Sequence, residues 1–241
     1  MLSAGWASSI AQEAGQSVLA APVSGVHNSG DIRGPAADTA TFTMTERPKA
    51  KRSRLDPDER RQQLLRVATE LLLQEGVLPL PMPKFSEAAQ VSKGLIYSYF
   101  PTQYDLFNAL LREHFAELNE AGLIKASKKR DLGQAAKTCA AIYFNHVATR
   151  GPVIHLILRD LFMSGQLDPG IRQIQLGVAG RLARLARTRL KMKSEEAIAA
   201  YSLLMAIPED AGRLVFQGEL PLDRGRELCM KLVDSALAAI A

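Results

Sequence analysis

Residues 83–101, PKFSEAAQVSKGLIYSYFP, leave room for two short helices joined by a tight turn. A helix can begin near Pro83, because the missing amide hydrogen of proline costs nothing in a first helical turn. Ser92 suits the N-cap of a second helix, and Pro101 ends it, since the residue before a proline avoids the helical conformation. Two short helices this closely connected form a helix-turn-helix.

Longer helices flank this motif. Before it, Asp56 and Glu59 fit a capping box around Pro57, and Gly76 supplies a stop. The apolar positions between these ends repeat with helical spacing: Leu64, Leu65, Ala68, Leu71 and Leu72. After the motif, Thr102 caps a helix whose apolar stripe reaches Leu118.

The rest of the chain continues the helical pattern, and no strand pattern competes with it. We expect helices at about 132–149, 152–164, 168–192, 194–217 with a kink at Pro208, and 223–240. The basic segment KASKKR after Ile124 predicts a polar bend. The predicted fold class is all-α, with a three-helix helix-turn-helix domain at 58–118 (motif at about 81–100) and a helical body at 119–241.

The first 54 residues are rich in Ala, Gly, Ser and Pro and lack a sustained period, which predicts a disordered extension. It ends in a basic arm that includes Arg52 and Arg54. This arm can attract phosphate or enter a minor groove, and a solvated basic tail is an equal alternative.

Composition narrows the function classes. The net charge of +5 is compatible with nucleic acid, acidic ligands or anionic lipid. No apolar run approaches the roughly 20 residues of a membrane span, and the start of the chain does not resemble a signal peptide. The two cysteines, Cys139 and Cys229, lie in apolar helical patterns, which favours reduced, buried thiols and a cytoplasmic protein. Because an apolar span is lacking, we predict no membrane partner.

An enzyme is not indicated. The four histidines have no metal-ligand spacing, no glycine-rich loop follows a strand, and no nucleophile stands in a recognisable elbow. We therefore predict no catalytic residues, no metal and no cofactor.

Together, RRQQLLRVATELLLQEG and FSEAAQVSKGLIYSYFPTQYDLFNALL resemble the N-terminal domain of the tetracycline-repressor (TetR) family. The match runs from about Asp58 to Leu118, and VSKGLIYSYFP is its most specific part. The resemblance implies a DNA-binding transcription regulator: a homodimer, released from an inverted-repeat operator in double-stranded DNA when the body binds a small-molecule effector.

The candidate DNA-binding residues lie mostly on the second short helix. Ser92 caps it, Lys93 adds a positive charge, and Gly94 allows close approach to base edges. By resemblance, Tyr97 matches the family tyrosine that binds a DNA phosphate. The complete set is Lys84, Ser92, Lys93, Gly94, Leu95, Tyr97 and Tyr99, with Arg52 and Arg54 of the arm; either tyrosine can instead be an ordinary half-buried packing residue.

Some residues depart from the family pattern. Gln90 stands where the family usually has glycine in the turn, and Gln103 replaces the lysine that usually follows the aromatic–proline pair. Pro81, Met82 and Pro83 replace a small hydroxyl residue near the start of the supporting helix. These changes motivate the alternative function, a helical ligand- or partner-binding dimer whose head has lost specific DNA binding.

The body is expected to dimerise and to hold the effector. Residues 228–240 carry an apolar face too broad for a surface helix, and by resemblance the last two helices form a four-helix dimer interface, with packing inside one subunit as the alternative. By resemblance, two body helices line an effector pocket. Its predicted ligand contacts, for which plain core packing is the alternative, are Tyr143, His146, His155, Phe162 and Met163.

Overall fold

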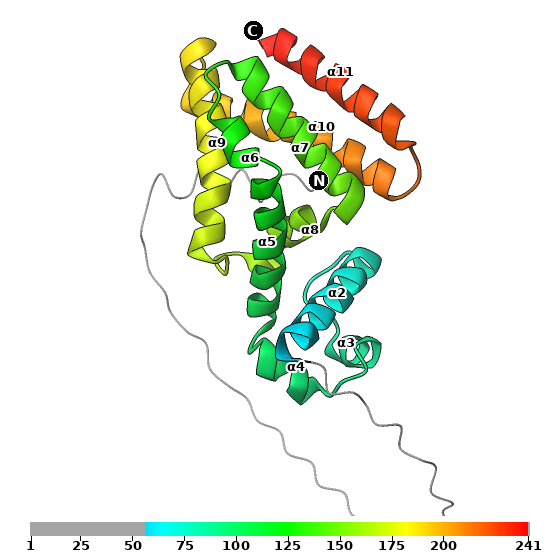
Figure 1. Cartoon of the computed structure of the whole chain (residues 1–241). Coiled ribbons are helices and arrows are strands. Elements are labelled where there is room, and N and C mark those ends of the chain that lie inside the picture. Colours follow the sequence, from blue (N-terminus) through cyan, green and yellow to red (C-terminus); the bar gives the residue numbers. More distant parts are fainter. Residues whose placement is uncertain (1–55, 241) are drawn as a thin grey trace, which may run out of the picture.

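The computed structural model describes residues 56–240, and Figure 1 shows them as a small head below a larger helical body. Within this range the secondary structure is helical and contains no strand. The elements are α2 (Pro57–Glu75), α3 (Met82–Ala88), α4 (Lys93–Tyr99), α5 (Gln103–Glu120), α6 (Leu123–Ser127), α7 (Leu132–Arg150), α8 (Val153–Arg159), the 3₁₀ turn η1 (Leu161–Met163), α9 (Pro169–Arg189), α10 (Ser194–Phe216) and α11 (Leu222–Ile240).

The caps expected from the sequence define the helices of the head. Asp56 and Glu59 form the capping box of α2, and Gly76 ends that helix in the left-handed conformation, with φ of 68°. The Ser92 side chain accepts a hydrogen bond from the Leu95 amide and so caps α4. Thr102 and Asp105 form a second capping box at α5.

Apolar packing unites the three head helices with the first half of α5. Phe85 of α3 and Ile96 of α4 are fully or almost fully buried, in the same cluster as Leu64 and Leu72 of α2. Phe100 is buried after α4, and the Arg61 guanidinium of α2 lies 5.4 Å from its ring centroid. The helix-turn-helix predicted from the sequence is confirmed.

The body is built around α7 and α10, which pack along each other and against α9 and α11 (Figure 1). Gly212 of α10 allows the close approach to α7, because a Cβ at this position would lie 2.7 Å from the Val147 Cβ. Cys139 and Cys229 are buried and free, as expected. No helix within 56–240 combines the length and hydropathy needed to cross a membrane.

Head and body are joined by more than α5. The Asp160 carboxylate, between α8 and η1, accepts hydrogen bonds from the Leu78 amide of the α2–α3 loop at 3.2 Å and from the Phe162 amide at 2.8 Å. Phe162 itself stacks on Tyr104 of α5, with ring centroids 4.5 Å apart. A segment of the body is therefore attached directly to the loop that leads into the helix-turn-helix.

Two predicted boundaries were wrong. The helix expected at 152–164 stops at Arg159, because Asp160 is extended, with ψ of 133°, and its carboxylate bonds two amides instead of continuing the helix. The KASKKR bend is also shorter than predicted, since α6 continues to Ser127 with Ala126 and Ser127 buried. The predicted extension 1–54, with Arg52 and Arg54, lies outside the described residues.

Candidate functional site

The α4 helix presents the predicted recognition residues to solvent at the lower end of the molecule (Figure 1). Ser92, Lys93 and Gly94 are exposed. A Cβ built on Gly94 would have only the Ser92 Oγ within 4 Å, at 3.9 Å, so nothing in the head covers this end of α4. The beginning of the helix is open to a large partner.

The two tyrosines of α4 differ in environment. Tyr97 is 44% exposed, whereas Tyr99 is half-buried and packs on the apolar core of the head. Leu95 is half-buried as well. Tyr97 is therefore the more accessible of the two aromatic candidates, and the packing alternative fits Tyr99 better.

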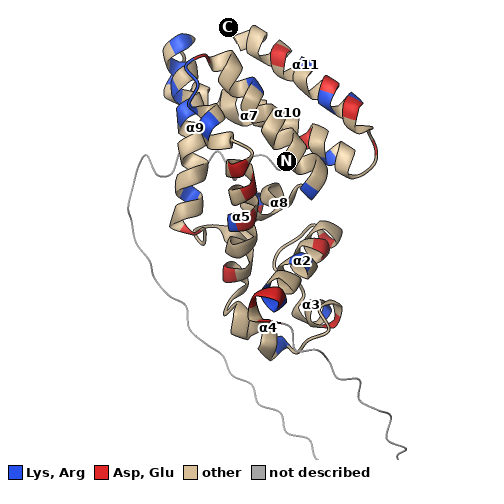
Figure 2. Cartoon of the chain, in the orientation of Figure 1, with Lys and Arg blue, Asp and Glu red and all other residues tan. Residues whose placement is uncertain are grey.

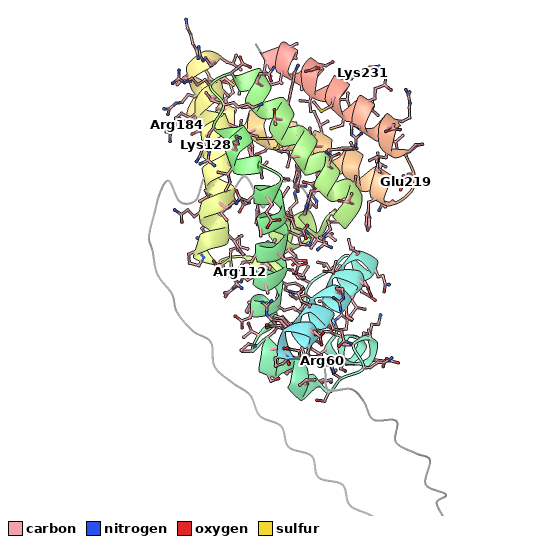
Figure 3. The ribbon with its side chains drawn as sticks, viewed as in Figure 1. Arg60, Arg112, Lys128, Arg184, Glu219 and Lys231 are labelled. Atoms are coloured by element: carbon pink, nitrogen blue, oxygen red, sulfur yellow. The ribbon has the colours of Figure 1, made fainter. Side chains whose placement is uncertain are left out.

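Both basic and acidic residues lie near the exposed face of α4. The ribbon in Figure 2 carries the colour of a basic residue on α4 and both charge colours at the beginning of α2, where Figure 3 labels Arg60. Lys84 of α3 forms an exposed ion pair with Glu75, with Nζ and Oε1 2.9 Å apart. Because such a pair contributes at most about 1 kcal/mol, it leaves Lys84 able to exchange its partner for a phosphate.

The two glutamines that depart from the family pattern have different structural consequences. Gln90 has φ of 53°, in the left-handed region that glycine adopts without strain, so this position of the turn carries some backbone strain. Gln103 forms two hydrogen bonds to Leu80: its Oε1 accepts from the amide at 2.8 Å, and its Nε2 donates to the carbonyl at 2.9 Å. Its amide therefore fastens the α2–α3 loop to α5.

A second candidate site lies inside the body, where α5 to α10 enclose a cavity of about 100 Å³. Its wall is largely apolar and includes Phe115, Leu118, Ile154, Val178 and Met205. The polar side chains that line it are Tyr143, His155, Arg159, Gln175, Tyr201, Ser202 and Glu209. The arrangement suits a small apolar molecule with a polar group.

Charges inside this cavity are partly paired. The His155 Nδ1 lies against the Glu209 carboxylate. Burial, followed by the positive charge of Arg159, lowers the pKa of His155 to about 4, so its imidazole is neutral at pH 7. Burial also raises the pKa of the Tyr143 phenol, which stays protonated and able to donate a hydrogen bond.

The model of a family described as bacterial regulatory proteins, tetR family, matches residues 64–110, which span α2 to the middle of α5. Over these residues the chain has a TetR-family DNA-binding domain. The nucleoid occlusion factor SlmA of Glaesserella parasuis serovar 5 is 30% identical over 137 residues, covering 56% of this chain and 58% of that relative. The HTH-type transcriptional activator FasR of Mycolicibacterium smegmatis is 23% identical over 192 residues, covering 78% of this chain and 88% of that relative.

Solved structures agree on the fold. A TetR-like transcriptional regulator from Rhodococcus sp. RHA1 has a TM-score of 0.57 at 19% identity, covering 77% of this chain and 99% of that chain. The TetR family regulator PfmR of Thermus thermophilus has a TM-score of 0.54 at 16% identity, covering 73% of this chain and 97% of that chain. The predicted fold class is confirmed, and the relatives support a DNA-binding regulator of the TetR family.

The TetR-type body does not bring all the predicted ligand contacts together. Tyr143 and His155 line the cavity, but His146, Phe162 and Met163 do not. Phe162 stacks on Tyr104 of α5, and Met163 is buried in the main apolar core. Their assignment to the pocket is corrected: the resemblance placed them on two pocket-lining helices, but it did not say which side chains of those helices face the cavity. The cavity is also lined by Arg159, Tyr201 and Glu209, which were not predicted because no local motif marks them.

His146 belongs instead to a polar cluster between α5 and α7. Its Nε2 lies 2.8 Å from the Nδ1 of His114, and its Nδ1 lies 3.6 Å from a Glu117 carboxylate oxygen. Ligand atoms of His114, Glu117 and His146 lie within 4.8 Å of one another, a proximity that sequence spacing did not reveal. The guanidinium of Arg150 is 3.0 Å from Glu117, and we interpret the group as a hydrogen-bonded buried network.

Proposed function

We propose that this TetR-family chain is a dimeric repressor whose two heads bind an inverted-repeat operator and whose body binds a small effector that releases the DNA. The observation that carries the DNA-binding part is the open beginning of α4, where Ser92, Lys93 and Gly94 are exposed beside Tyr97. A single seven-residue helix reads few bases, so two heads in successive major grooves, roughly 34 to 36 Å apart, are needed for specificity. DNA as a partner also supports a cytoplasmic location.

Exposed apolar side chains on α10 and α11 support the dimer. Leu228 and Leu232 of α11 are each 47% exposed, and Leu203 of α10 is 73% exposed. On the other side of α11, Cys229 and Val233 are fully buried within the subunit. The broad apolar face of α11 thus has two halves: one packs internally, and the other is available to a second copy of the chain.

The link between cavity and head supports release by an effector. Arg159 lines the cavity at the end of α8, and the next residue, Asp160, accepts a hydrogen bond from Leu78 in the α2–α3 loop. A ligand that shifts the end of α8 would therefore act on this loop and on the placement of the head. Such a shift changes affinity for DNA only if the ligand binds the two arrangements unequally.

A salt-dependent gel shift with the DNA upstream of the chain's own gene tests DNA recognition. We expect saturable binding that Lys93→Ala combined with Tyr97→Ala weakens at least tenfold, since two exposed contacts are lost. Lys128→Ala is the control, because Lys128 is an exposed basic residue of the body (Figure 3). Equal affinity for random DNA, or no difference from the control, would contradict the proposal.

Light scattering coupled to size-exclusion chromatography tests the dimer. Leu228→Asp combined with Leu232→Asp should give a folded monomer, because two charges would have to be buried in the interface. The control is Arg224→Ala, which replaces an exposed charged residue on the same helix and should remain dimeric. A wild-type monomer at micromolar concentration would rule out the dimer.

Gln103 favours a second candidate, a helical ligand- or partner-binding dimer without specific DNA binding. Both the oxygen and the nitrogen of its side-chain amide form hydrogen bonds with the Leu80 backbone, whereas the lysine usual at this position points toward a phosphate. The same gel shift separates the candidates, because this one predicts no preference for the upstream DNA over random DNA of equal length.

A further inference from the structure

Within the described residues, three polar side chains line the cavity in the body without a hydrogen bond or ion pair: Tyr143, Arg159 and Gln175, whose amide can both donate and accept. Tyr143 of α7 and Arg159 of α8 both line it. Within residues 56–240, neither the Tyr143 hydroxyl nor the Arg159 guanidinium makes a hydrogen bond or ion pair. A phenol and a guanidinium are both donors, so the chemistry that satisfies them is an acceptor, and preferably an anion.

The neighbouring carboxylates contact groups other than Arg159. Glu209 is the carboxylate that lines the cavity, and His155 contacts it. Asp210, the next acidic residue on α10, pairs with Arg213 at 3.3 Å. Within the described residues, Arg159 is thus left without an ion-pair partner beside a largely apolar space. Its influence on Tyr143 and His155, whose pKa values it lowers, agrees with a position near both side chains.

The size of the cavity limits the rest of the ligand. About 100 Å³ is smaller than an engineered apolar cavity of roughly 150 Å³ that holds benzene. The Arg159 side chain is exposed and lies at the opening, whereas Phe115, Leu118 and Val178 line the wall. A ligand that fits therefore has its charge at the opening and a compact apolar body inside, for which a single ring is the upper limit of size.

We propose that the body binds a small monocarboxylic acid, whose carboxylate accepts hydrogen bonds from Arg159 and Tyr143 while a compact hydrocarbon group fills the cavity. This inference rests on the proposed function, since it names the chemical class of the effector. It also gives the effector a route to the head, because Arg159 immediately precedes Asp160, which bonds the head loop. The short apolar wall excludes long acyl chains unless the cavity opens.

Isothermal titration calorimetry with matched probes tests this inference on the full chain. Hexanoate and benzoate are the acids, hexanamide and benzamide are their neutral counterparts, and hexylamine carries the opposite charge. We expect at least one acid to bind at least tenfold more tightly than its amide, and hexylamine not to bind. Equal affinity for acid and amide, or no binding of either acid, would overturn the proposal.

Variants then assign the selectivity to the named residues. Arg159→Gln should weaken binding of the acid at least tenfold while leaving the amide unchanged, and Tyr143→Phe should weaken the acid severalfold. Arg184→Gln, an exposed arginine of α9 that does not line this cavity (Figure 3), is the matched control. An acid affinity unchanged in Arg159→Gln would overturn the assignment of the carboxylate.

Failure here is distinguishable from failure of the proposed function. DNA binding is measured by gel shift on the ligand-free protein and does not depend on the identity of the acid. A chain that binds the upstream DNA specifically but does not distinguish acids from amides keeps the proposed function and loses this inference. Conversely, selective acid binding without DNA binding supports this inference and the second candidate function.

Discussion

Replacing Gln103 by alanine should loosen the connection between the α2–α3 loop and the beginning of α5. The side chain makes two hydrogen bonds to one residue 23 positions earlier: its Oε1 accepts from the Leu80 amide at 2.8 Å, and its Nε2 donates to the Leu80 carbonyl at 2.9 Å. Leu80 is 2% exposed, so its side chain is anchored in the core at the same point. Alanine would leave both backbone groups without their partner.

The magnitude follows from these two bonds. Each contributes about 0.5 to 1.5 kcal/mol net, and a buried polar group left unsatisfied costs about 1 to 3 kcal/mol. Because both bonds are only partly buried, water can reach the vacated space, and the lower part of each range applies. We expect a loss of about 2 kcal/mol in the free energy of unfolding, or roughly 4 to 8 °C in melting temperature for a domain of this size.

Urea unfolding and amide hydrogen exchange measure this effect. Gln62→Ala is the control, because Gln62 is exposed on α2 and makes no hydrogen bond within the described residues. Gln103→Ala should lower the unfolding midpoint relative to this control and speed exchange of the Leu80 amide. If the two variants unfold alike and the Leu80 amide exchanges at the wild-type rate, the two-bond connection does not stabilise the head.

Three further predictions concern backbone and protonation. Gln90→Gly should raise the free energy of unfolding by up to about 1 kcal/mol in urea, since it relieves the left-handed φ of 53°, whereas Gln90→Ala should not. Gly151→Ala should cost about 1 to 3 kcal/mol more than Gly165→Ala: both have φ above 70°, but only the first Cβ would meet other side chains, as near as 2.7 Å. Burial lowers the pKa values of His114 and His146 to about 3 and about 4, so the unfolded chain takes up protons at a higher pH than the folded chain does. The free energy of unfolding should therefore fall as the pH drops below 6.5, by at most about 1.4 kcal/mol per pH unit for each histidine. Replacing both histidines with glutamine should make the melting temperature less dependent on pH in this range.

Local chemistry explains why the head could be predicted almost residue by residue. Asp56, Ser92 and Thr102 each satisfy free amides at the start of their own helix, within three residues of themselves. Pro101 and Gly76 restrict or permit backbone angles by their covalent structure alone. None of these effects depends on distant parts of the chain, so the sequence determines them directly.

The site in the body depends on contacts that no local pattern encodes. The resemblance placed Tyr143 and His146 on a pocket-lining helix, but α7 has several inward directions: Tyr143 faces the cavity, and His146 faces His114 of α5. Arg159 was missed for the same reason, since an arginine at a helix end usually lies in solvent. Its role follows only from the cavity beside it.

Asp160 takes part both in local helix capping and in a long-range contact. Its carboxylate ends α8, starts η1 through the Phe162 amide and reaches the Leu78 amide, 82 positions earlier in the chain. The first two effects are local, and the third fixes the head to the body. A helix break of this kind has a physical cause at long range, because the carboxylate must leave the helical register to bond the loop. Arg159 lines the cavity and directly precedes Asp160 in the chain. Ligand binding at Arg159 and the placement of the head through Asp160 therefore depend on the same stretch of backbone.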